Sequence, residues 1–325
     1  MKDRIRDGEN TRRNPTVNCE KDHLGDESDQ DKAVAAIEKA GGTVTFDAQD
    51  PAKPVTEVSF RSVEKITDAE LALVKPLTKI RSLDLAGTKV TDAGLAHLKG
   101  LAGLQNLDLF ATEIGNPGLE QLKGHSDLRK LNLYGTKVTA DGLKHLKSLN
   151  ELRSLNLFDL KIGDEGLEHL KGLSKLESLG LLNTGISDAG LAHLKGLTRM
   201  ESLHVNSSDI TDAGLEHLKG MTQLKSLSLN YTSVKGPGFA HLKGMAKLWW
   251  LELGKTQITD EGLKPLADLK ALAELNLQET AISDAGLAHL RGLKKLNNLN
   301  LHKTKVTEGG IKDLQKALPT TRIVR

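Results

Sequence analysis

The sequence has almost no cysteine, few aromatic residues, no long apolar run and no excess of charge. Its one cysteine, Cys19, excludes an internal disulfide framework and a zinc site built from cysteines. Aromatic residues make up 3% of the 325 residues, so a single large compact core is not expected. The balance of 45 Lys and Arg against 43 Asp and Glu gives no strong attraction to nucleic acid. No apolar run approaches the ~18 residues of a membrane span.

The amino-terminal segment is rich in charge and has no apolar core typical of a signal peptide. Residues 1–30 are expected to be disordered because they contain few apolar side chains. Residues 31–54 contain an amphipathic stretch, DKAVAAIEKA, and a predicted strand over Thr43–Phe46. We expect them to form a helix-strand cap on the segment that follows. Without a leader or disulfides the protein is predicted to be cytoplasmic, or secreted or periplasmic if the true start carries a leader.

The main feature of the sequence is an internal repeat. The pattern LxL recurs every 24 residues, at Leu83, Leu107, Leu131, Leu155, Leu179, Leu203, Leu227, Leu251, Leu275 and Leu299. These are ten full repeats of the form LxxLxxLxLxxTxITDxGLxxLKG, preceded by a partial repeat around Val58 and followed by a terminal strand at Ile323. Chance does not maintain such a register, so residues 55–325 are predicted to form one repeat domain.

Each repeat predicts a short strand, a turn and a helix. The leucines of LxL share one face of a strand, since its side chains alternate. An aspartate such as Asp92 or Asp188 precedes the helical segment and is predicted to cap it, as is Asn116 where Asp is absent. A unit this small cannot bury its leucines alone, so neighbouring repeats must stack. The predicted fold class is α/β, a right-handed solenoid of 24-residue repeats curved into a horseshoe, with a parallel sheet on the concave side and helices on the convex side.

The repeat resembles a known family. Units such as GTKVTDAGLAHLKGL are similar to leucine-rich repeat proteins, in particular the ribonuclease-inhibitor-like and cysteine-containing subclasses and bacterial, planctomycete-type members. Threonine or serine, as at Thr88 and Ser208, stands where those subclasses carry Asn or Cys. The resemblance covers residues 55–325. It implies the solenoid fold and a binding role, although fold alone does not define function.

Three aromatic residues are predicted to project side by side from the concave face. The residues before, between and after the two leucines point to that face and form a first, a second and a third column along the sheet. Phe110, Tyr134 and Phe158 follow one another in the third column, about 5 Å apart, and Leu182 continues it. We interpret this stripe as a partner-binding site. The alternative is a ladder that only stabilises neighbouring strands.

A second candidate is formed by Tyr231, Trp249 and Trp250. Trp250 belongs to the first concave column, whereas Trp249 lies one residue earlier, in a column that is otherwise charged or polar in most repeats. Trp249 should therefore be exposed to solvent. Exposed tryptophans favour a binding role; the alternative is packing along the rim of the sheet.

Other conspicuous residues are interpreted as structural. Each helix supplies one histidine of a column made up of His97, His145, His169, His193, His217, His241 and His289. Neighbouring helices are about 8–10 Å apart, too far for two such histidines to bind one zinc ion at about 2 Å. His204 and His302 are concave but solitary. Helical lysines are expected to pair with the glutamates three residues before them, Glu120, Glu168 and Glu216.

No catalytic residue, metal or cofactor is predicted. The chain has no phosphate loop, metalloprotease motif or dinucleotide fingerprint. Residues 124–128 begin like a nucleophile elbow but lack its final glycine. Adjacent His, Ser and Asp side chains also diverge, so they cannot form a triad.

The sequence therefore predicts a non-catalytic, monomeric scaffold that binds a protein partner on its concave face, without a nucleic acid or a membrane span. Concave acidic residues such as Asp84, Asp108 and Glu252 argue against nucleic acid. One alternative is a substrate-recognition subunit similar to F-box-type ubiquitin-ligase proteins, although the first 50 residues show no helical bundle of F-box size. Others are a structural or envelope-associated spacer and a carbohydrate binder that stacks sugars on the same aromatic side chains.

The stacking model makes a direct prediction about stability. Leu131→Asp or Leu155→Asp would place a charge between neighbouring repeats and uncouple them, at a cost of about 3–5 kcal/mol in the free energy of unfolding. Denaturant unfolding followed by circular dichroism measures this loss. One sharp transition at unchanged stability in these variants would contradict the solenoid.

Overall fold

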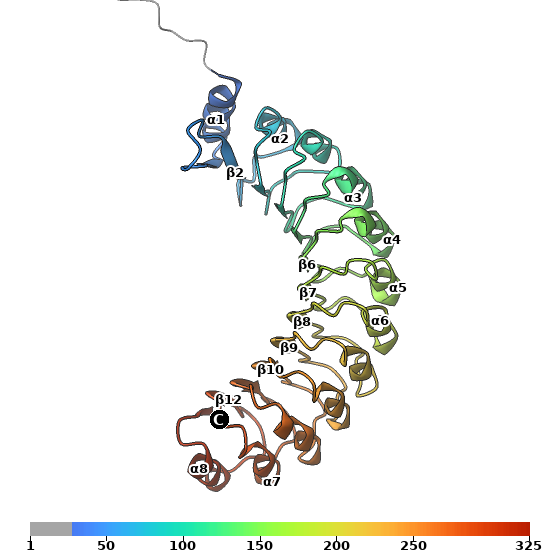
Figure 1. The fold of residues 1–325 in the computed structure, drawn as a ribbon, viewed down its shortest axis with the longest axis vertical. Helices are drawn as coiled ribbons and strands as arrows, with labels where there is room; N and C mark the ends of the chain where they lie inside the picture. The colour runs from blue at the N-terminus through green and yellow to red at the C-terminus, as the bar shows by residue number, and fades with distance from the viewer. Residues whose placement is uncertain (1–27) are drawn as a thin grey trace, which may run out of the picture.

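The described part of the protein, residues 28–325 of a computed structural model, is an arc of stacked units (Figure 1). Thirteen strands form one sheet whose order follows the chain, and the helices lie along the outer side of the arc. The first pair of strands is antiparallel and every later pair is parallel. The predicted α/β solenoid with a concave sheet and convex helices is confirmed.

The strands are short and regular. They are β1 (Thr43–Phe46), β2 (Val55–Ser59), β3 (Ser82–Asp84), β4 (Asn106–Asp108), β5 (Lys130–Asn132), β6 (Ser154–Asn156), β7 (Ser178–Gly180), β8 (Ser202–His204), β9 (Ser226–Ser228), β10 (Trp250–Glu252), β11 (Glu274–Asn276), β12 (Asn298–Asn300) and β13 (Arg322–Val324). The first leucine of each repeat pairs with the first leucine of the next, as Leu83 does with Leu107. Ile323 pairs with Leu299, so the predicted terminal strand is present.

Most of the helices are one or two turns long, and many of them are 3-10 helices. The α-helices are α1 (Asp29–Lys39), α2 (Asp68–Leu71), α3 (Asn116–Gln121), α4 (Ala140–Leu143), α5 (Gly163–Glu168), α6 (Asp188–His193), α7 (Asp284–Leu287) and α8 (Glu308–Ala317). The 3-10 helices are η1 (Ala72–Val74), η2 (Gly94–Leu98), η3 (Leu122–Gly124), η4 (Lys144–Ser148), η5 (Gly214–Leu218), η6 (Pro237–Leu242), η7 (Glu261–Asp268) and η8 (Ala288–Leu290). None of the helices within residues 28–325 combines the length and the apolar character that crossing a bilayer needs.

Helix α1 packs against β1 and η1 at the amino-terminal end of the sheet. Helix α1 begins at Asp29, two residues before its predicted start, and is capped by the Ser28 side chain, which accepts from the Asp31 N–H. Its buried side chains Ala33 and Ile37 belong to the same core as Phe60. Of the segment predicted to be disordered, residues 1–27 lie outside the described residues, and residues 29 and 30 belong to α1.

One continuous core runs the length of the solenoid. The strand leucines are at most about 2% exposed, and they pack with the apolar side chains of the helices and turns. The buried threonines contribute hydrogen bonds to the turns: Thr88 Oγ1 donates to the Leu85 carbonyl at 2.7 Å, and Thr112 repeats this contact with Leu109. Threonine thus satisfies a carbonyl within its own repeat.

The aspartate that most repeats share does not cap its own helix, so this prediction was wrong. The hydroxyl of the preceding residue does so instead, as Ser187 Oγ accepts from the Ala189 N–H. Asp188 reaches the next repeat, where its Oδ1 accepts from the Thr211 N–H at 2.9 Å and its Oδ2 from Thr211 Oγ1 at 2.6 Å. The carboxylate is better satisfied there because two donors converge on it.

This contact between repeats explains the glycine that follows the aspartate by two residues. A Cβ atom on Gly214 would overlap Asp188 Oδ1 of the preceding repeat, and a Cβ on Gly190 would overlap Asp164 Oδ1 in the same way. Glycine leaves the space in which the carboxylate of the preceding repeat lies. The Thr-Asp-x-Gly pattern is therefore a connection between consecutive repeats and not only a helix start.

We expect Asp188→Ala to lower the free energy of unfolding by about 1–2 kcal/mol, because it removes two hydrogen bonds to a half-exposed carboxylate. Asp188→Asn is the control. Asn116 makes the equivalent contacts with Thr139 through its side-chain oxygen and nitrogen, at 2.9 and 2.8 Å. Urea unfolding should therefore show a large shift for the alanine variant and a small one for the asparagine variant. Equal loss in both would mean that the hydrogen bonds contribute little.

Candidate functional site

The concave face is built from the outward residues of the parallel strands. In β4 the leucine is buried while Asn106 and Asp108 beside it are half-buried, and most other repeats share this alternation. The third column follows directly at the end of each strand. Because the strand ladder keeps the register from one repeat to the next, side chains of one column lie beside one another across the sheet.

The predicted aromatic stripe is a chain of ring contacts. The ring centroids of Phe110 and Tyr134 are 4.9 Å apart with an interplanar angle of 47°, and those of Tyr134 and Phe158 are 5.9 Å apart at 69°. All three side chains are half-buried, as is Leu182, the next residue of the column. Tilted and edge-to-face contacts at these distances are the favourable geometry for aromatic pairs. The three rings therefore support one another and still contribute apolar surface to the concave face.

The stripe continues into His204, which the sequence had suggested to be solitary. The centroid of the His204 ring lies 6.3 Å from that of Phe158, at an interplanar angle of 76°. Gly180 makes this contact possible: a Cβ there would stand only 2.6 Å from Phe158 Cε1. Since glycine occupies the second column of β7, the Phe158 ring can lie over that strand toward β8. The glycine and the histidine are visible in the sequence, but only the side-chain packing shows that they belong together.

The second predicted cluster is divided by the structure. Trp250 joins the stripe, with its ring centroid 5.7 Å from that of His204. Trp249 is 46% exposed, as predicted, and Tyr231 is 54% exposed. The Tyr231 ring contacts Lys255, whose Nζ lies 4.6 Å from the ring centroid. Five rings, Phe110, Tyr134, Phe158, His204 and Trp250, thus form one line from β4 to β10, which we call the aromatic line.

Opposite charges pair at the amino-terminal end of the concave face. Arg61 donates through Nε to Asp84 and through Nη2 to Asp108, both at 2.7 Å. These hydrogen bonds and the charge of the two carboxylates raise the pKa of Arg61, against a smaller effect of burial. Arg61 occupies the third column of the partial repeat, a position that sequence reasoning did not single out. To reach Asp108 on β4 its side chain extends past β3, whose third-column residue, Ala86, has a small side chain.

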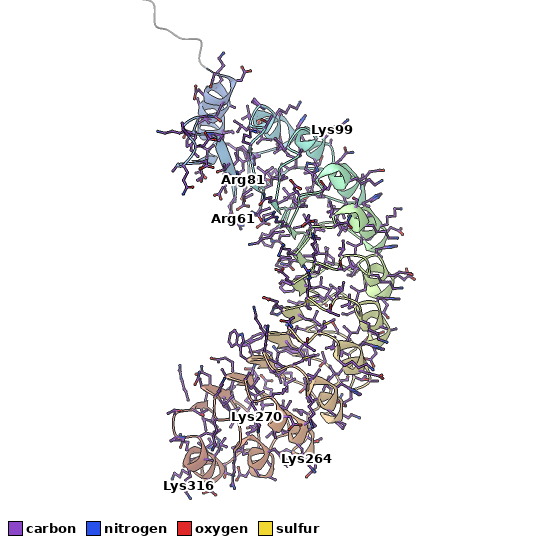
Figure 2. The ribbon with its side chains drawn as sticks, viewed as in Figure 1. Arg61, Arg81, Lys99, Lys264, Lys270 and Lys316 are labelled. Carbon is purple, nitrogen blue, oxygen red and sulfur yellow. The ribbon has the colours of Figure 1, made fainter. Side chains whose placement is uncertain are left out.

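Basic residues lie on both sides of the arc. Figure 2 shows Arg61 and Arg81 on its inner side and Lys99 and Lys264 on its outer side. The predicted helical ion pairs are present, between Lys123 and Glu120 at 2.9 Å and in two further repeats, Lys171 with Glu168 and Lys219 with Glu216. The convex lysines and glutamates thus form local pairs on a solvated face.

The convex histidines do not form a site. Within residues 28–325 no group of three His, Cys, Asp or Glu side chains is close enough to hold a metal ion. His125, part of the segment that begins like a nucleophile elbow, is buried and takes a core position that is leucine or methionine in the full repeats. Its Nε2 lies 3.0 Å from the Leu98 carbonyl and donates to it. That ring has a structural contact and not a catalytic arrangement.

Comparison with known proteins gives a clear match. A family model described as a leucine-rich repeat region matches residues 58–322. An internalin from Listeria monocytogenes is 20% identical, with a TM-score of 0.66, over 92% of this chain and 94% of that one. A Leptospira interrogans leucine-rich repeat protein is 16% identical, with a TM-score of 0.55, over 78% and 74% of the two chains.

A plant peptide hormone receptor, RGFR1 in complex with RGF2, has the same type of fold. It is 15% identical, with a TM-score of 0.53, and the match covers 86% of this chain and 48% of the receptor. At these identities the solved structures establish the fold alone. No curated protein matches the sequence.

Burial lowers the pKa of His204 below its usual value of about 6.5, and the charge of Glu252 opposes this shift only in part. Nuclear magnetic resonance titration of the His204 Cε1–H, assigned by its loss in His204→Gln, should give a midpoint below pH 6.5. The neutral ring is then favoured in the folded state. Stability is fully present above pH 6.5 and is lost as the pH falls toward the lowered midpoint. A midpoint at or above 6.5 would show that the ring is more solvated than the aromatic line requires.

Proposed function

The chain belongs to the leucine-rich repeat family, and we propose that it is a non-catalytic, monomeric scaffold that binds a protein partner on its concave sheet. The observation that carries this proposal is the aromatic line. It joins one histidine and four of the nine Phe, Trp and Tyr residues of the chain across seven consecutive strands. Aromatic side chains are enriched among the few residues that dominate the binding energy of protein interfaces.

The geometry of the line favours a binding surface over a ladder that only stabilises the sheet. A stabilising ladder needs contacts between directly neighbouring strands. The contacts of His204 with Phe158 and Trp250 each pass over an intervening strand, β7 at Gly180 in the first case and β9 in the second. Small residues under long rings produce a continuous apolar surface in the middle of an otherwise polar face. Because the strands hold it rigid, little conformational entropy would be lost on binding.

The other candidate functions fit the surface less well. A spacer without a ligand has no reason to expose Trp249 and Tyr231. A carbohydrate binder would present flat ring faces, whereas Phe110, Tyr134 and Phe158 meet at steep angles and cover one another's edges. A substrate-recognition subunit of the F-box type would bind its partner on the same surface. That alternative differs only in what happens to the partner after binding. The complex of a plant peptide hormone receptor supports a peptide or protein ligand for this type of fold.

The test is an affinity capture with the protein and a triple variant, Phe110→Ser/Tyr134→Ser/Phe158→Ser. The variant should lose at least 90% of a captured partner, because its concave face loses the aromatic side chains. A matched control, His97→Ser/His145→Ser/His193→Ser, changes three convex residues and should capture the partner as the wild type does. Circular dichroism shows whether each variant is folded.

The outcomes separate the candidate functions. Loss in the concave variant alone supports the aromatic line as the site. Equal capture by all three proteins would move the site to Trp249, Tyr231 or the convex face. Binding to a glycan array but to no protein would favour the carbohydrate binder, and absence of any ligand would favour the spacer.

A further inference from the structure

At the end of each concave strand, one backbone N–H lies outside the ladder and needs a side chain as its hydrogen-bond acceptor. The N–H of the third-column residue leaves the ladder and points to the second column of its own repeat. Asp84 Oδ1 accepts from the Ala86 N–H at 3.0 Å, and Asn132 Oδ1 accepts from the Tyr134 N–H at 3.1 Å. The same contact recurs in the repeats that have Asp108, Asn156, Asn276 and Asn300 in the second column.

Two repeats meet this requirement in a different way. Their second-column residues, Ser228 and Glu252, do not accept from the N–H, and an asparagine in the third column of the preceding repeat takes over. Asn206 Oδ1 accepts from the Asn230 N–H at 2.9 Å, and Asn230 Oδ1 accepts from the Gly254 N–H at 2.6 Å.

Neither solution is available at the centre of the face. Leu182 has Gly180 in its second column and Phe158 in the preceding third column, and neither offers a side-chain acceptor. Asn206 has His204 and Leu182 in those places. Among residues 28–325, the N–H groups of Leu182 and Asn206 accordingly have no hydrogen-bond acceptor. They lie at the ends of adjacent strands, about 4.8 Å apart by the general spacing of a sheet.

The surroundings of these two N–H groups are uncharged and rich in donors. The first and second columns of β7, β8 and β9 hold Ser178, Gly180, Ser202, His204, Ser226 and Ser228. Arg153 and Lys225, at the start of strands nearby, are already paired with Glu177 and Glu201 at 2.7 Å. The carboxylates nearest to this centre also have hydrogen-bond partners: Asp159 accepts from Asn183, and Glu252 accepts from Asn230 and Asn276.

The Phe158 ring fills the second-column space at Gly180 to which the Leu182 N–H points, which leaves the Asn206 N–H as the donor for a ligand. We propose that this centre receives the carboxylate of an aspartate or glutamate side chain on an extended segment of the partner, with the N–H of Asn206 as its backbone donor. The inference rests on the proposed function and specifies the chemistry of the ligand. A carboxylate suits a backbone donor that has no acceptor within the protein, because hydrogen bonds to an ionised acceptor are the stronger ones. Arg153 and Lys225 are engaged in ion pairs, which favours a singly charged carboxylate over a more highly charged phosphate. Apolar residues beside the acid then pack on Phe158 and Trp250.

A substitution that copies the neighbouring repeats is expected to block this site. Leu182→Asn places an asparagine where Asn206 and Asn230 have theirs, so that its Oδ1 accepts from the Asn206 N–H and removes this donor. Leu182→Ala removes the same apolar side chain without supplying an acceptor. Gln278→Asn is the matched control. The third-column N–H of the next repeat, that of His302, already donates to Asn300 at 3.0 Å, so the new asparagine blocks no free donor.

The experiment selects from a displayed library of random 12-residue peptides fused at both ends, so that no free carboxyl terminus is offered. Wild type should enrich peptides with one Asp or Glu next to an aliphatic or aromatic residue. A selected peptide is then synthesised with blocked ends, and its dissociation constant is compared with that of its Glu→Gln or Asp→Asn form. The acid should bind wild type, Leu182→Ala and Gln278→Asn at least tenfold more tightly than the amide. For Leu182→Asn the ratio should fall to about threefold or less.

Several results would overturn the inference. They are selected peptides without an acid, an acid-to-amide ratio near one on wild type, or an undiminished ratio on Leu182→Asn. If the selected peptides nevertheless need Phe158 and Trp250 for binding, only the carboxylate assignment fails and the proposed function stands. If no peptide is selected, or binding does not depend on the aromatic line, the concave binding function fails with it.

Discussion

Burial of leucine between neighbouring repeats is the interaction on which the whole structure depends. A strand of three residues cannot form a core, and Leu83 is shielded because Leu107 and the turn residues of the next repeat pack against it. Each apolar contact therefore also positions the next strand. The result is a sheet whose outward residues keep their column from one repeat to the next, which makes a long rigid surface possible with so few aromatic residues.

Polar contacts repeat with the same regularity and determine where substitution is tolerated. Asp188 bridges to Thr211, and Gly214 leaves the space for its carboxylate. The turn threonines and the strand-end acceptors satisfy backbone groups that would otherwise be left without partners. A repeat that departs from these patterns lacks either a hydrogen-bond acceptor or a side chain that the other repeats have at the same position.

The departures gather at the middle of the concave face. Gly180 removes a side chain and lets the Phe158 ring pass over a strand, while His204 replaces an asparagine that would have accepted from the backbone. The apolar Phe158 and Leu182 stand where the following repeats begin to use asparagine. The same substitutions thus create an apolar line and leave two backbone donors beside it, the combination of anchors and directional groups expected at a binding surface.

The sequence by itself determined the repeat register, the solenoid, the concave columns and the exposure of Trp249, because these follow from a period of alternating leucines that every copy shares. It also placed Phe110, Tyr134 and Phe158 side by side for the same reason. Only the tertiary structure decided that Asp188 serves the next repeat, that Arg61 reaches Asp108, and that His204 links Phe158 to Trp250. Those contacts depend on how far each side chain extends across neighbouring strands and on the space that Ala86 and Gly180 leave, which a one-dimensional pattern does not contain.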